Sequence, residues 1–338
     1  MAGAIHTREE LILKQSLPLE VKVRMTEERI AQWYYYWGGQ VYVSFSGGKD
    51  STVLLHIARN IFPDIEAVYV DTGLEYPEIR EFVKGFDNVT WLKPKKNFKQ
   101  IIEEYGYPVI SKKDAKVIRY ERKYRETGIG LSYHLKYIGE FKHKDKINKS
   151  QFNLSEKWRS MADAPFKISD ECCDFMKKEP AHRYTKESGK KPIIGILAEE
   201  SVARTARWLK DGCNAFESKN PQSNPMSFWT EQDVLHYIFK HKIPIAKPYG
   251  KIVVDDEDYI EGQITIDDSI LDDVPMKCTG CNRTGCMFCM FGAHLEKSPN
   301  RFEKMKETHP KIYDYCMRST EDGGLGMDEV LNYLNIKH

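Results

Sequence analysis

The sequence predicts an α/β fold in which a Rossmann-like parallel sheet carries helices on both faces. Strand-like and helix-like segments alternate along much of the chain, and repeated strand–helix units favour a parallel sheet. A glycine-rich turn joins the first predicted strand to a helix. Apolar residues make up 41% and charged residues 30% of the 338 residues, which is typical of a globular rather than a disordered chain.

The predicted elements begin with a helical segment over residues 8–37, which has intermittent apolar positions. Four strands follow, and each leads into a helix. We expect the strands at 41–45, 67–70, 89–92 and 193–197, and their helices at 52–60, 77–84, 98–105 and 201–209. Ligands of such sheets bind at the carboxyl ends of the strands, so the segments directly after the strands are the candidate site.

The turn after the first strand reads Ser-Gly-Gly-Lys-Asp-Ser over residues 46–51. Its glycines let backbone N–H groups approach an oxyanion, and the start of the helix adds partial positive charge. Lys49 adds a full charge, while Ser46 and Ser51 add hydroxyl donors. The spacing excludes a Walker loop, which needs four residues between Gly and Gly-Lys. The segment is instead a complete pyrophosphatase loop (PP-loop) signature, which predicts that the chain binds nucleotide phosphates.

Polar residues also follow two other predicted strands. Asp71-Thr72-Gly73 comes after the second strand, and a carboxylate there suits a ribose hydroxyl or a magnesium ion. The alternative is that Asp71 or Thr72 caps the helix that begins near Pro77. The strand at 193–197 leads into Ala198-Glu199-Glu200-Ser201.

The ordered motifs resemble the phosphoadenosine phosphosulfate (PAPS) reductase family of the adenine-nucleotide alpha-hydrolase superfamily. The resemblance covers roughly residues 30–310, and the segments that carry it are 45–58, 70–83, 172–180, 195–207, 225–234 and 285–289. It implies that Lys49, Asp50, Arg204 and Arg207 act in catalysis, since bidentate arginines suit phosphate or sulfate. The implied nucleotide-binding residues are Ser44, Phe45, Ser46, Gly47, Gly48, Lys49, Asp50, Ser51, Asp71, Thr72, Gly73, Gly195, Glu200 and Ser201.

Two features depart from the ordinary reductases of this family. Those enzymes carry a nucleophilic cysteine in a Glu-Cys-Gly tail, whereas here no cysteine follows Cys316. The complete loop with Lys49 resembles instead the ATP-using members, which include the ATP sulfurylase small subunit, the tRNA thiolases and the DNA phosphorothioation enzymes. We therefore expect AMP-forming adenylyl transfer from ATP or a related adenine nucleotide, in sulfur-transfer chemistry with a sulfur donor or thiol reductant. The alternatives are a sulfonucleotide reductase that forms sulfite and a regulator that senses a nucleotide without turnover.

Four of the eight cysteines form a compact metal-binding pattern. Cys278, Cys281, Cys286 and Cys289 make two Cys-x-x-Cys pairs within 12 residues, and each pair can chelate one centre. The short connection between the pairs favours an iron–sulfur cluster over a zinc ribbon, with zinc as the alternative. The resemblance implies another ligand set for a [4Fe–4S] cluster, in which Cys172 and Cys173 join Cys286 and Cys289, and a mixed set is a third choice. Cys213 and Cys316 are expected to be buried thiols.

Composition divides the chain into three predicted domains. Residues 1–38 form an N-terminal helical segment, residues 39–250 the PP-loop α/β domain, and residues 251–338 an acidic linker followed by a Cys-rich region. A basic insertion at about 111–165 interrupts the α/β domain, and between residues 112 and 159 there are 14 Lys and Arg against six Asp and Glu.

The basic segment 112–159 makes nucleic acid a candidate partner, because basic residues interleaved with tyrosines bind phosphates and stack bases. Charge reversal at Lys112, Lys113, Arg119 and Arg122 is then expected to abolish binding. The alternative is a solvated helical face.

The chain begins without the apolar region of a signal peptide, and no stretch approaches the ~18–20 apolar residues of a membrane span. We therefore expect a cytoplasmic protein with no membrane partner, and a homo-oligomer is compatible with the sequence.

Overall fold

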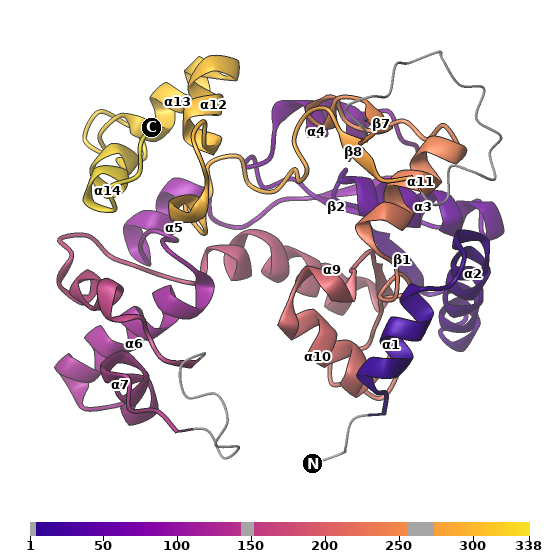
Figure 1. The fold of residues 1–338 in the computed structure, drawn as a ribbon, viewed down its shortest axis with the longest axis horizontal. Coiled ribbons are helices and arrows are strands. Elements are labelled where there is room, and N and C mark those ends of the chain that lie inside the picture. Colours follow the sequence, from indigo (N-terminus) through magenta and orange to yellow (C-terminus); the bar gives the residue numbers. More distant parts are fainter. Residues whose placement is uncertain (1–4, 143–151, 256–273) are drawn as a thin grey trace. The chain divides into compact units, whose positions relative to one another are not determined.

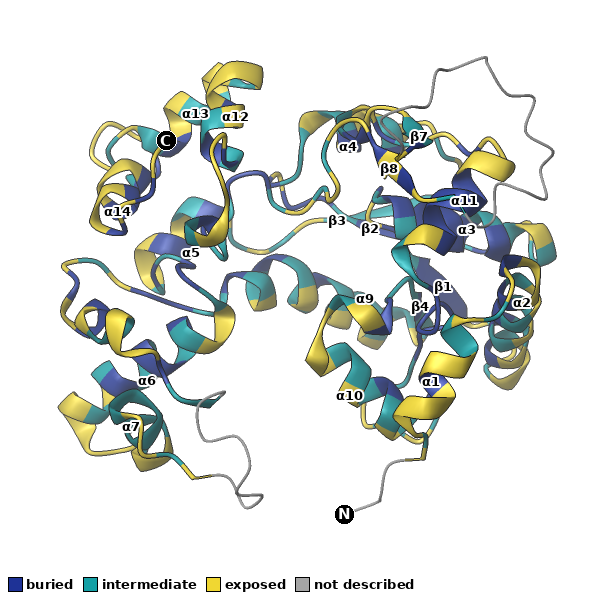
Figure 2. Cartoon of the chain, in the orientation of Figure 1, coloured by how far each residue is buried: buried dark blue, intermediate teal, exposed yellow. Residues whose placement is uncertain are grey.

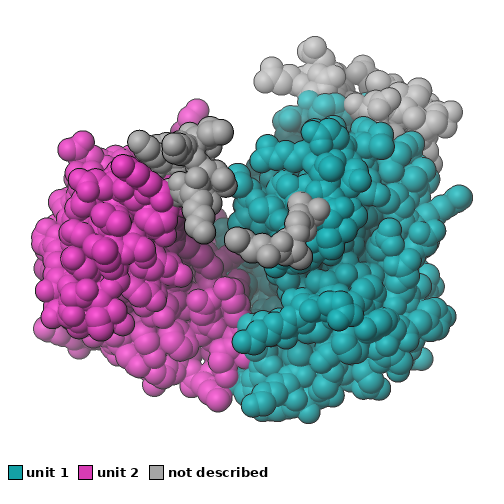
Figure 3. Space-filling view, turned by 90° about the horizontal axis from the view of Figure 1, so that it is seen from below, with its two compact units in different colours: residues 1–93, 180–284 teal, residues 94–179, 285–338 magenta. Residues whose placement is uncertain are grey.

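The computed structural model describes residues 5–142, 152–255 and 274–338. The chain divides into two compact units, which Figure 3 colours separately. Unit 1 contains residues 1–93 and 180–284, and unit 2 contains residues 94–179 and 285–338. Each unit is thus built from two separate stretches of chain, whereas the predicted domains follow composition along the chain. Most of the predicted acidic linker, residues 256–273, lies outside the described residues.

Unit 1 is built around a six-stranded sheet with the strand order β3-β2-β1-β4-β6-β5. Figure 1 labels β1 and β2 of this sheet. All neighbouring strands are parallel except β5 and β6, which pair antiparallel. The predicted parallel sheet is therefore confirmed. The strands are β1 (Val41–Ser44), β2 (Ala67–Val70), β3 (Val89–Leu92), β4 (Lys191–Ile194), β5 (Asn214–Ala215) and β6 (Gln222–Ser223). A separate antiparallel pair consists of β7 (Ile252–Val254) and β8 (Met276–Cys278).

The helices of unit 1 cover the sheet and share its core. They are α1 (Arg8–Gln15), α2 (Leu19–Tyr36), α3 (Lys49–Ile61), α4 (Pro77–Lys84), α9 (Glu179–Ser188), α10 (Val202–Asp211) and α11 (Glu231–Lys240). The predicted helix over 8–37 is in fact two helices, because Pro18 has no backbone N–H to donate and becomes the N-cap of α2. Figure 2 shows β1 and α3 in the dark blue of buried residues, and α3 packs against α2 and α11.

Unit 2 is helical in its described part. Its helices are α5 (Phe98–Glu104), α6 (Lys112–Thr127), α7 (Leu131–Ile138), α12 (Arg301–Thr308), α13 (Pro310–Met317) and α14 (Met327–Tyr333). The basic insertion is helical at its start, as its sequence predicts: Ser111 caps α6, and α6 packs against α7. A short π-helix, Asp174–Lys178, directly follows Cys172 and Cys173. Among the helices of the described ranges, none is long and apolar enough to cross a membrane.

Candidate nucleotide-binding site

The loops after β1, β2 and β4 leave the sheet at the same edge. Ser44, the last residue of β1, lies in register with Val68 of β2 and Ile194 of β4, and all three strands are parallel. Gly195 then passes close to the PP-loop, because a Cβ atom at this position would lie 3.1 Å from the backbone oxygen of Asp50. The edge is the one at which parallel sheets bind ligands.

The PP-loop is shaped by one glycine and two serines. Gly47 has a φ of +71°, and a Cβ atom there would lie 2.8 Å from Cγ2 of Ile79 on α4, so only glycine fits. The hydroxyls of Ser46 and Ser51 lie 3.0 Å apart and tie the two ends of the loop together. The backbone N–H of Gly48 donates to the Ser46 hydroxyl at 3.3 Å, and Gly48 is the N-cap of α3.

Lys49, the first residue of α3, is buried and its ammonium group is already engaged. Its Nζ lies 2.9 Å from a carboxylate oxygen of Glu231 at the start of α11 and donates to the backbone oxygen of Asn282 at 2.9 Å. Burial works against the charge on Lys49, but the Asp50 and Glu231 carboxylates outweigh it and raise the pKa of this lysine. The ammonium group is therefore held as a cation at the start of a helix.

The segment around Tyr249 and Thr284 lies directly against the PP-loop. The backbone N–H of Lys49 donates to the Tyr249 hydroxyl at 3.1 Å, and this hydroxyl forms a 2.7 Å hydrogen bond with Thr284. A Cβ atom on Gly48 would lie 3.2 Å from the same Tyr249 oxygen. The backbone N–H and the ammonium group of Lys49, which would face a phosphate in an anion-binding loop, therefore both have hydrogen-bond partners within the chain.

Asp50 is the one acid inside the loop, and its surroundings are unusual for a carboxylate. Burial raises its pKa, while Lys49 partly offsets this effect. Its Oδ1 is buried and has no hydrogen-bond partner among the described residues. A buried carboxylate oxygen without a partner suits a bound cation, so the chemistry of Asp50 fits a magnesium ion at the PP-loop.

The start of α10 carries the predicted acidic and arginine residues. Ser201 is its N-cap and accepts a hydrogen bond from the Arg204 N–H. Arg204 forms an ion pair with Glu200, which also lies 3.4 Å from Arg283. Burial is the main cause that lowers the pKa of Arg204, and Asp50 of the PP-loop opposes it electrostatically. The structure therefore brings Arg204 and Glu200 toward the loop.

Arg207 and Arg204 line a cavity of about 210 Å³ together with Ile196, Asn224 and Ser227. Arg207 is partly exposed, and its ion pair with Asp211 is long, at 4.0 Å. A small cavity with two guanidinium groups on its wall suits an oxyanion.

The polar residues of the turn after β2 form their ion pair and hydrogen bonds with residues of the same turn and of α4. Asp71 is buried and forms a 2.9 Å ion pair with Arg80 of α4. The Thr72 hydroxyl bonds to Glu75 and accepts the N–H of Leu74. The N-cap of α4 is Tyr76, with no side-chain cap, so Asp71 and Thr72 do not cap this helix.

The remaining predicted nucleotide-binding residues have simpler roles in the structure. Phe45 is buried, and its ring packs against Phe86 at 4.9 Å, so its side chain belongs to the core. Ser44 ends β1, and Gly73 has a φ of +69° with open space at its Cβ position.

The cysteine pairs fall in different units. Cys278 and Cys281 belong to unit 1, where Cys278 ends β8, whereas Cys286 and Cys289 belong to unit 2 with Cys172 and Cys173. No group of three or more His, Cys, Asp or Glu within residues 5–142, 152–255 and 274–338 is arranged to hold a metal ion. The structure therefore does not display a ligand set for either predicted metal.

Four of the five thiols of unit 2, those of Cys172, Cys173, Cys286 and Cys289, nevertheless interact. The pKa of Cys173 is lowered to about 5, chiefly by a hydrogen bond from Cys172 and also by the positive charges of Lys112 and Lys177, while burial opposes them. Cys172 also interacts electrostatically with Cys286 and Cys289. Thiolates are the ligands of iron–sulfur clusters, so the donor chemistry of this group fits such a cluster.

The basic helices α6 and α7 use much of their charge inside unit 2. Arg122 donates to four backbone oxygens at 2.8–3.0 Å, those of Met161, Ala162, Ala164 and Phe166. Arg119 forms an ion pair with Asp170 at 2.8 Å, and Tyr120 stacks on Tyr133 at 4.2 Å. These contacts favour a structural role for the two arginines over a surface for nucleic acid.

Sequence patterns did not indicate several residues at the PP-loop. Glu231 lies inside a segment that carries the family resemblance, but nothing in the pattern gives it a role. Tyr249 follows the loop by about 200 residues and belongs to no motif, and Asn282 and Thr284 lie between the two Cys-x-x-Cys pairs, whose pattern gives roles only to the cysteines. Only the folding of unit 1 places them against Lys49.

Comparison with known proteins identifies the family. The sequence matches the phosphoadenosine phosphosulfate reductase domain over residues 40–130 and 124–291. An Adenosine 5'-phosphosulfate reductase of Geobacillus thermodenitrificans is 21% identical over 239 residues, which are 71% of this chain and 80% of that protein. A solved phosphoadenylyl-sulfate (PAPS) reductase from Candida auris, in a phosphate complex, is 14% identical and aligns with 72% of this chain and 92% of that chain at a TM-score of 0.37.

Two uncharacterised proteins of Methanocaldococcus jannaschii are also similar. One is 43% identical over 70 residues, or 19% of this chain, and the other is 24% identical over 219 residues, or 62% of this chain. The matched regions are 17% and 34% of those two proteins, so this chain spans a minor part of each. The domain match itself runs from the first strand of the sheet through the PP-loop to the last Cys-x-x-Cys pair, and this chain therefore belongs to the phosphoadenosine phosphosulfate reductase family.

Proposed function

We propose that this chain is an enzyme that binds an adenine nucleotide over the PP-loop and cleaves ATP at the alpha phosphate in sulfur-transfer chemistry. The observation that carries this proposal is the buried ammonium group of Lys49 at the first turn of α3. Backbone N–H groups and a lysine at a helix start are suited to stabilise the charge of a leaving pyrophosphate.

The proposed reaction has two displacement steps. An acceptor oxygen attacks the alpha phosphorus, the bond to the bridging oxygen of pyrophosphate breaks, and the acceptor becomes adenylated. A sulfur donor then attacks the activated acceptor and releases AMP. Lys49 stabilises the pyrophosphate, Ser46 and Ser51 orient phosphate oxygens, and Arg204 and Arg207 hold an oxyanion from the side of α10. Asp50 would hold magnesium through its unpartnered oxygen.

A [4Fe–4S] cluster held by Cys172, Cys173, Cys286 and Cys289 is the second part of this proposal. Its support is the interaction among these four thiols of unit 2 and the nearby cationic residues. Such a cluster supplies electrons or binds sulfur when it is present. Anaerobically purified protein is then expected to contain about four irons and four sulfides per chain, as cysteine-held clusters of this type do. One zinc per chain and no visible colour would contradict this part and favour a structural zinc site.

A second candidate function is sulfonucleotide reduction, and the family match together with the Geobacillus relative gives it at least equal support. In this reaction a thiolate attacks the sulfur of the sulfonucleotide and the adenosine phosphate leaves. A second thiol then releases sulfite and leaves a disulfide, which an external thiol reductant restores.

Product analysis separates the candidates. ATP labelled in its alpha phosphate is expected to yield AMP and pyrophosphate in the presence of the acceptor, whereas ADP as the sole product would exclude the adenylyl scheme. Sulfite release from PAPS or adenosine phosphosulfate with a thiol donor would instead support the reductase. Nucleotide binding without turnover of any of these compounds would leave a nucleotide-sensing regulator.

Matched lysine variants test whether the activity belongs to the PP-loop. Lys49→Ala is expected to abolish turnover, because it removes the ammonium group that faces the phosphates. Lys84→Ala removes an exposed lysine of α4 that pairs with Glu81 and is expected to leave turnover unchanged. Equal activity of both variants would place the reaction elsewhere.

A further inference from the structure

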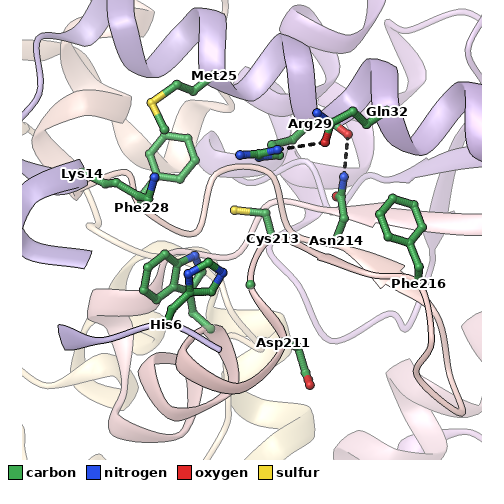
Figure 4. A pocket seen from close by; sticks show the side chains of 12 residues that line it. His6, Lys14, Met25, Arg29, Gln32, Asp211, Cys213, Asn214, Phe216 and Phe228 are labelled. Atoms are coloured by element: carbon green, nitrogen blue, oxygen red, sulfur yellow. Dashed lines mark hydrogen bonds between the residues drawn. The ribbon is translucent and has the colours of Figure 1, made fainter. Parts of the chain in front are cut away.

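Unit 1 contains a second cavity that none of the predicted site residues lines. It has a volume of about 250 Å³ and lies among α1, α2, the end of α10 and the β5 region (Figure 4). Its wall includes Lys14, Arg29, Trp208, Cys213 and Phe228. The cavity is slightly smaller than the ~300–1,000 Å³ of typical ligand pockets, which limits its occupant to a small molecule.

Two cations line this cavity, and no ion pair of either is formed within the described residues. In the described part of the chain, neither Lys14 nor Arg29 forms an ion pair, and the only side-chain hydrogen bond of the Arg29 guanidinium is to Gln32 at 2.9 Å. The carboxylate of Glu10, one turn before Lys14, lies 3.0 Å from the His6 ring nitrogen and outside the cavity wall, and it acts on Lys14 electrostatically without an ion pair. Two unpaired cations on one small cavity leave a net positive charge for a ligand to neutralise.

The other groups near the two cations bring little negative charge. The indole N–H of Trp208 is buried and acts on the Cys213 thiol as a hydrogen-bond donor. Burial raises the pKa of the Cys213 thiol, so this neighbour brings no negative charge near neutral pH. Figure 4 shows the Arg29 guanidinium and the Cys213 sulfur pointing into the same space. The carboxylate on the wall is that of Asp211, which lies 3.8 Å from Lys210 and 4.0 Å from Arg207.

The rest of the wall is apolar and aromatic. Trp208 stacks on His6 with 4.7 Å between the ring centroids, and Met25 and Phe228 line the cavity beside them. A wall that combines cationic donors with aromatic rings suits a molecule with an oxyanion at one end and a flat apolar body.

We propose that this cavity binds a small organic anion, with its carboxylate or phosphate between Lys14 and Arg29 and its apolar body against Phe228 and Met25. The cavity shares no residue with the PP-loop, whereas Trp208 and Gly212 also line the cavity of Arg204 and Arg207, so competition with ATP is part of the test below.

Calorimetric titration with benzoate, phenyl phosphate and uncharged benzyl alcohol tests this site in the full chain. At least one of the two anions is expected to bind roughly tenfold or more tightly than benzyl alcohol, since a charge-assisted hydrogen bond is lost with the alcohol. Preference for benzoate would identify a carboxylate ligand, and preference for phenyl phosphate a phosphorylated one. Failure of both anions to bind at about 1 mM, or competition of the bound anion with ATP, would overturn the proposal.

Variants of one helix provide the matched control. Arg29→Gln is expected to weaken anion binding roughly tenfold or more, while Arg24→Gln, an exposed arginine on the same helix α2, leaves it unchanged. Equal losses in both variants would mean a non-specific charge effect and overturn the site.

A labelling measurement on the unaltered chain does not depend on variant folding. The bound anion is expected to slow the reaction of a maleimide with Cys213, located by mass spectrometry, without slowing its reaction with Cys281. An unchanged Cys213 rate at a saturating anion concentration would also contradict the proposal.

Discussion

Lys49 illustrates what single residues contribute to this site. Its place after two glycines predicts that it binds a phosphate. In the structure, its ammonium group forms an ion pair with Glu231 and donates a hydrogen bond to the Asn282 carbonyl. A phosphate that binds over the loop has to replace these partners. The charge of Glu231 therefore competes with the nucleotide for one ammonium group.

Glu231→Gln tests this competition. Without the carboxylate, nucleotide affinity is expected to rise about two- to fivefold, because a partly exposed ion pair is worth about 0.5–1 kcal/mol. Calorimetric titration with a non-hydrolysable ATP analogue measures the change, and Glu81→Gln, on the exposed face of α4, is the control. Weaker binding in Glu231→Gln would mean that the acid positions Lys49 for the nucleotide.

Cys173 carries a prediction about pH. Its lowered pKa, about 5, means that the thiolate predominates at every pH above that value. In metal-free protein, the alkylation rate of Cys173 with iodoacetamide is expected to change little between about pH 6 and 9, whereas an ordinary thiol with a pKa near 8.5 reacts faster as the pH rises. Peptide mass spectrometry measures the rates, and the denatured chain is the reference. A rate that follows the denatured chain would show that the folded unit does not stabilise the thiolate.

At the scale of elements, the PP-loop depends on its fit against α4. Gly47 has a left-handed φ and no room for a Cβ atom, since Ile79 and Val83 lie within 3 Å of that position. A loop of this shape therefore requires both the glycine and the apolar face of the neighbouring helix.

Gly47→Ala and Gly189→Ala separate these two requirements. Both positions have a similar φ, +71° and +75°, but the space beside Gly189 is open. Gly189→Ala is expected to lower the free energy of unfolding by about 1–2 kcal/mol, and Gly47→Ala by a further ~1–3 kcal/mol from crowding. Urea unfolding measures both variants. An equal decrease in the free energy of unfolding of both variants would show that α4 moves to accommodate the added methyl group.

The basic helix α6 carries a second prediction at this scale. Arg122→Met removes the donor to four backbone oxygens and is expected to cost about 2–4 kcal/mol of stability, because buried carbonyls lose their partners. Lys123→Gln, one residue further and exposed, is expected to change stability by less than about 0.5 kcal/mol. An unchanged free energy of unfolding in Arg122→Met would contradict the structural role and support a role of Arg122 in ligand binding.

At the scale of the whole molecule, the chain builds each unit from two distant stretches, and the four cysteines of the Cys-rich motif divide between them. Spacing alone favours one centre held by both Cys-x-x-Cys pairs. Electrostatic interactions instead link Cys172 with Cys173, Cys286 and Cys289.

Cysteine substitutions distinguish the two ligand sets. Cys172→Ser is expected to lower the iron and sulfide content of anaerobically purified protein strongly, while Cys278→Ser leaves both nearly unchanged. Iron and sulfide assays with visible spectra measure the effect. Loss of the cluster in Cys278→Ser alone would favour the compact set of four cysteines within 12 residues.

Local patterns of apolar residues and short motifs predicted the parallel sheet, four of its six strands, the PP-loop and the family, whereas the two-residue strands β5 and β6 are too short to leave such a pattern. The break at Pro18 is also a local property, although the apolar pattern over 8–37 predicted one helix. Tertiary structure decided what surrounds Lys49: Glu231, Tyr249 and Asn282 come from segments about 180 to 230 residues away. It also decided that Arg122 holds backbone oxygens and that Lys14 and Arg29 meet at one cavity. Such contacts depend on how elements far apart in the sequence pack, and local sequence patterns do not predict that packing.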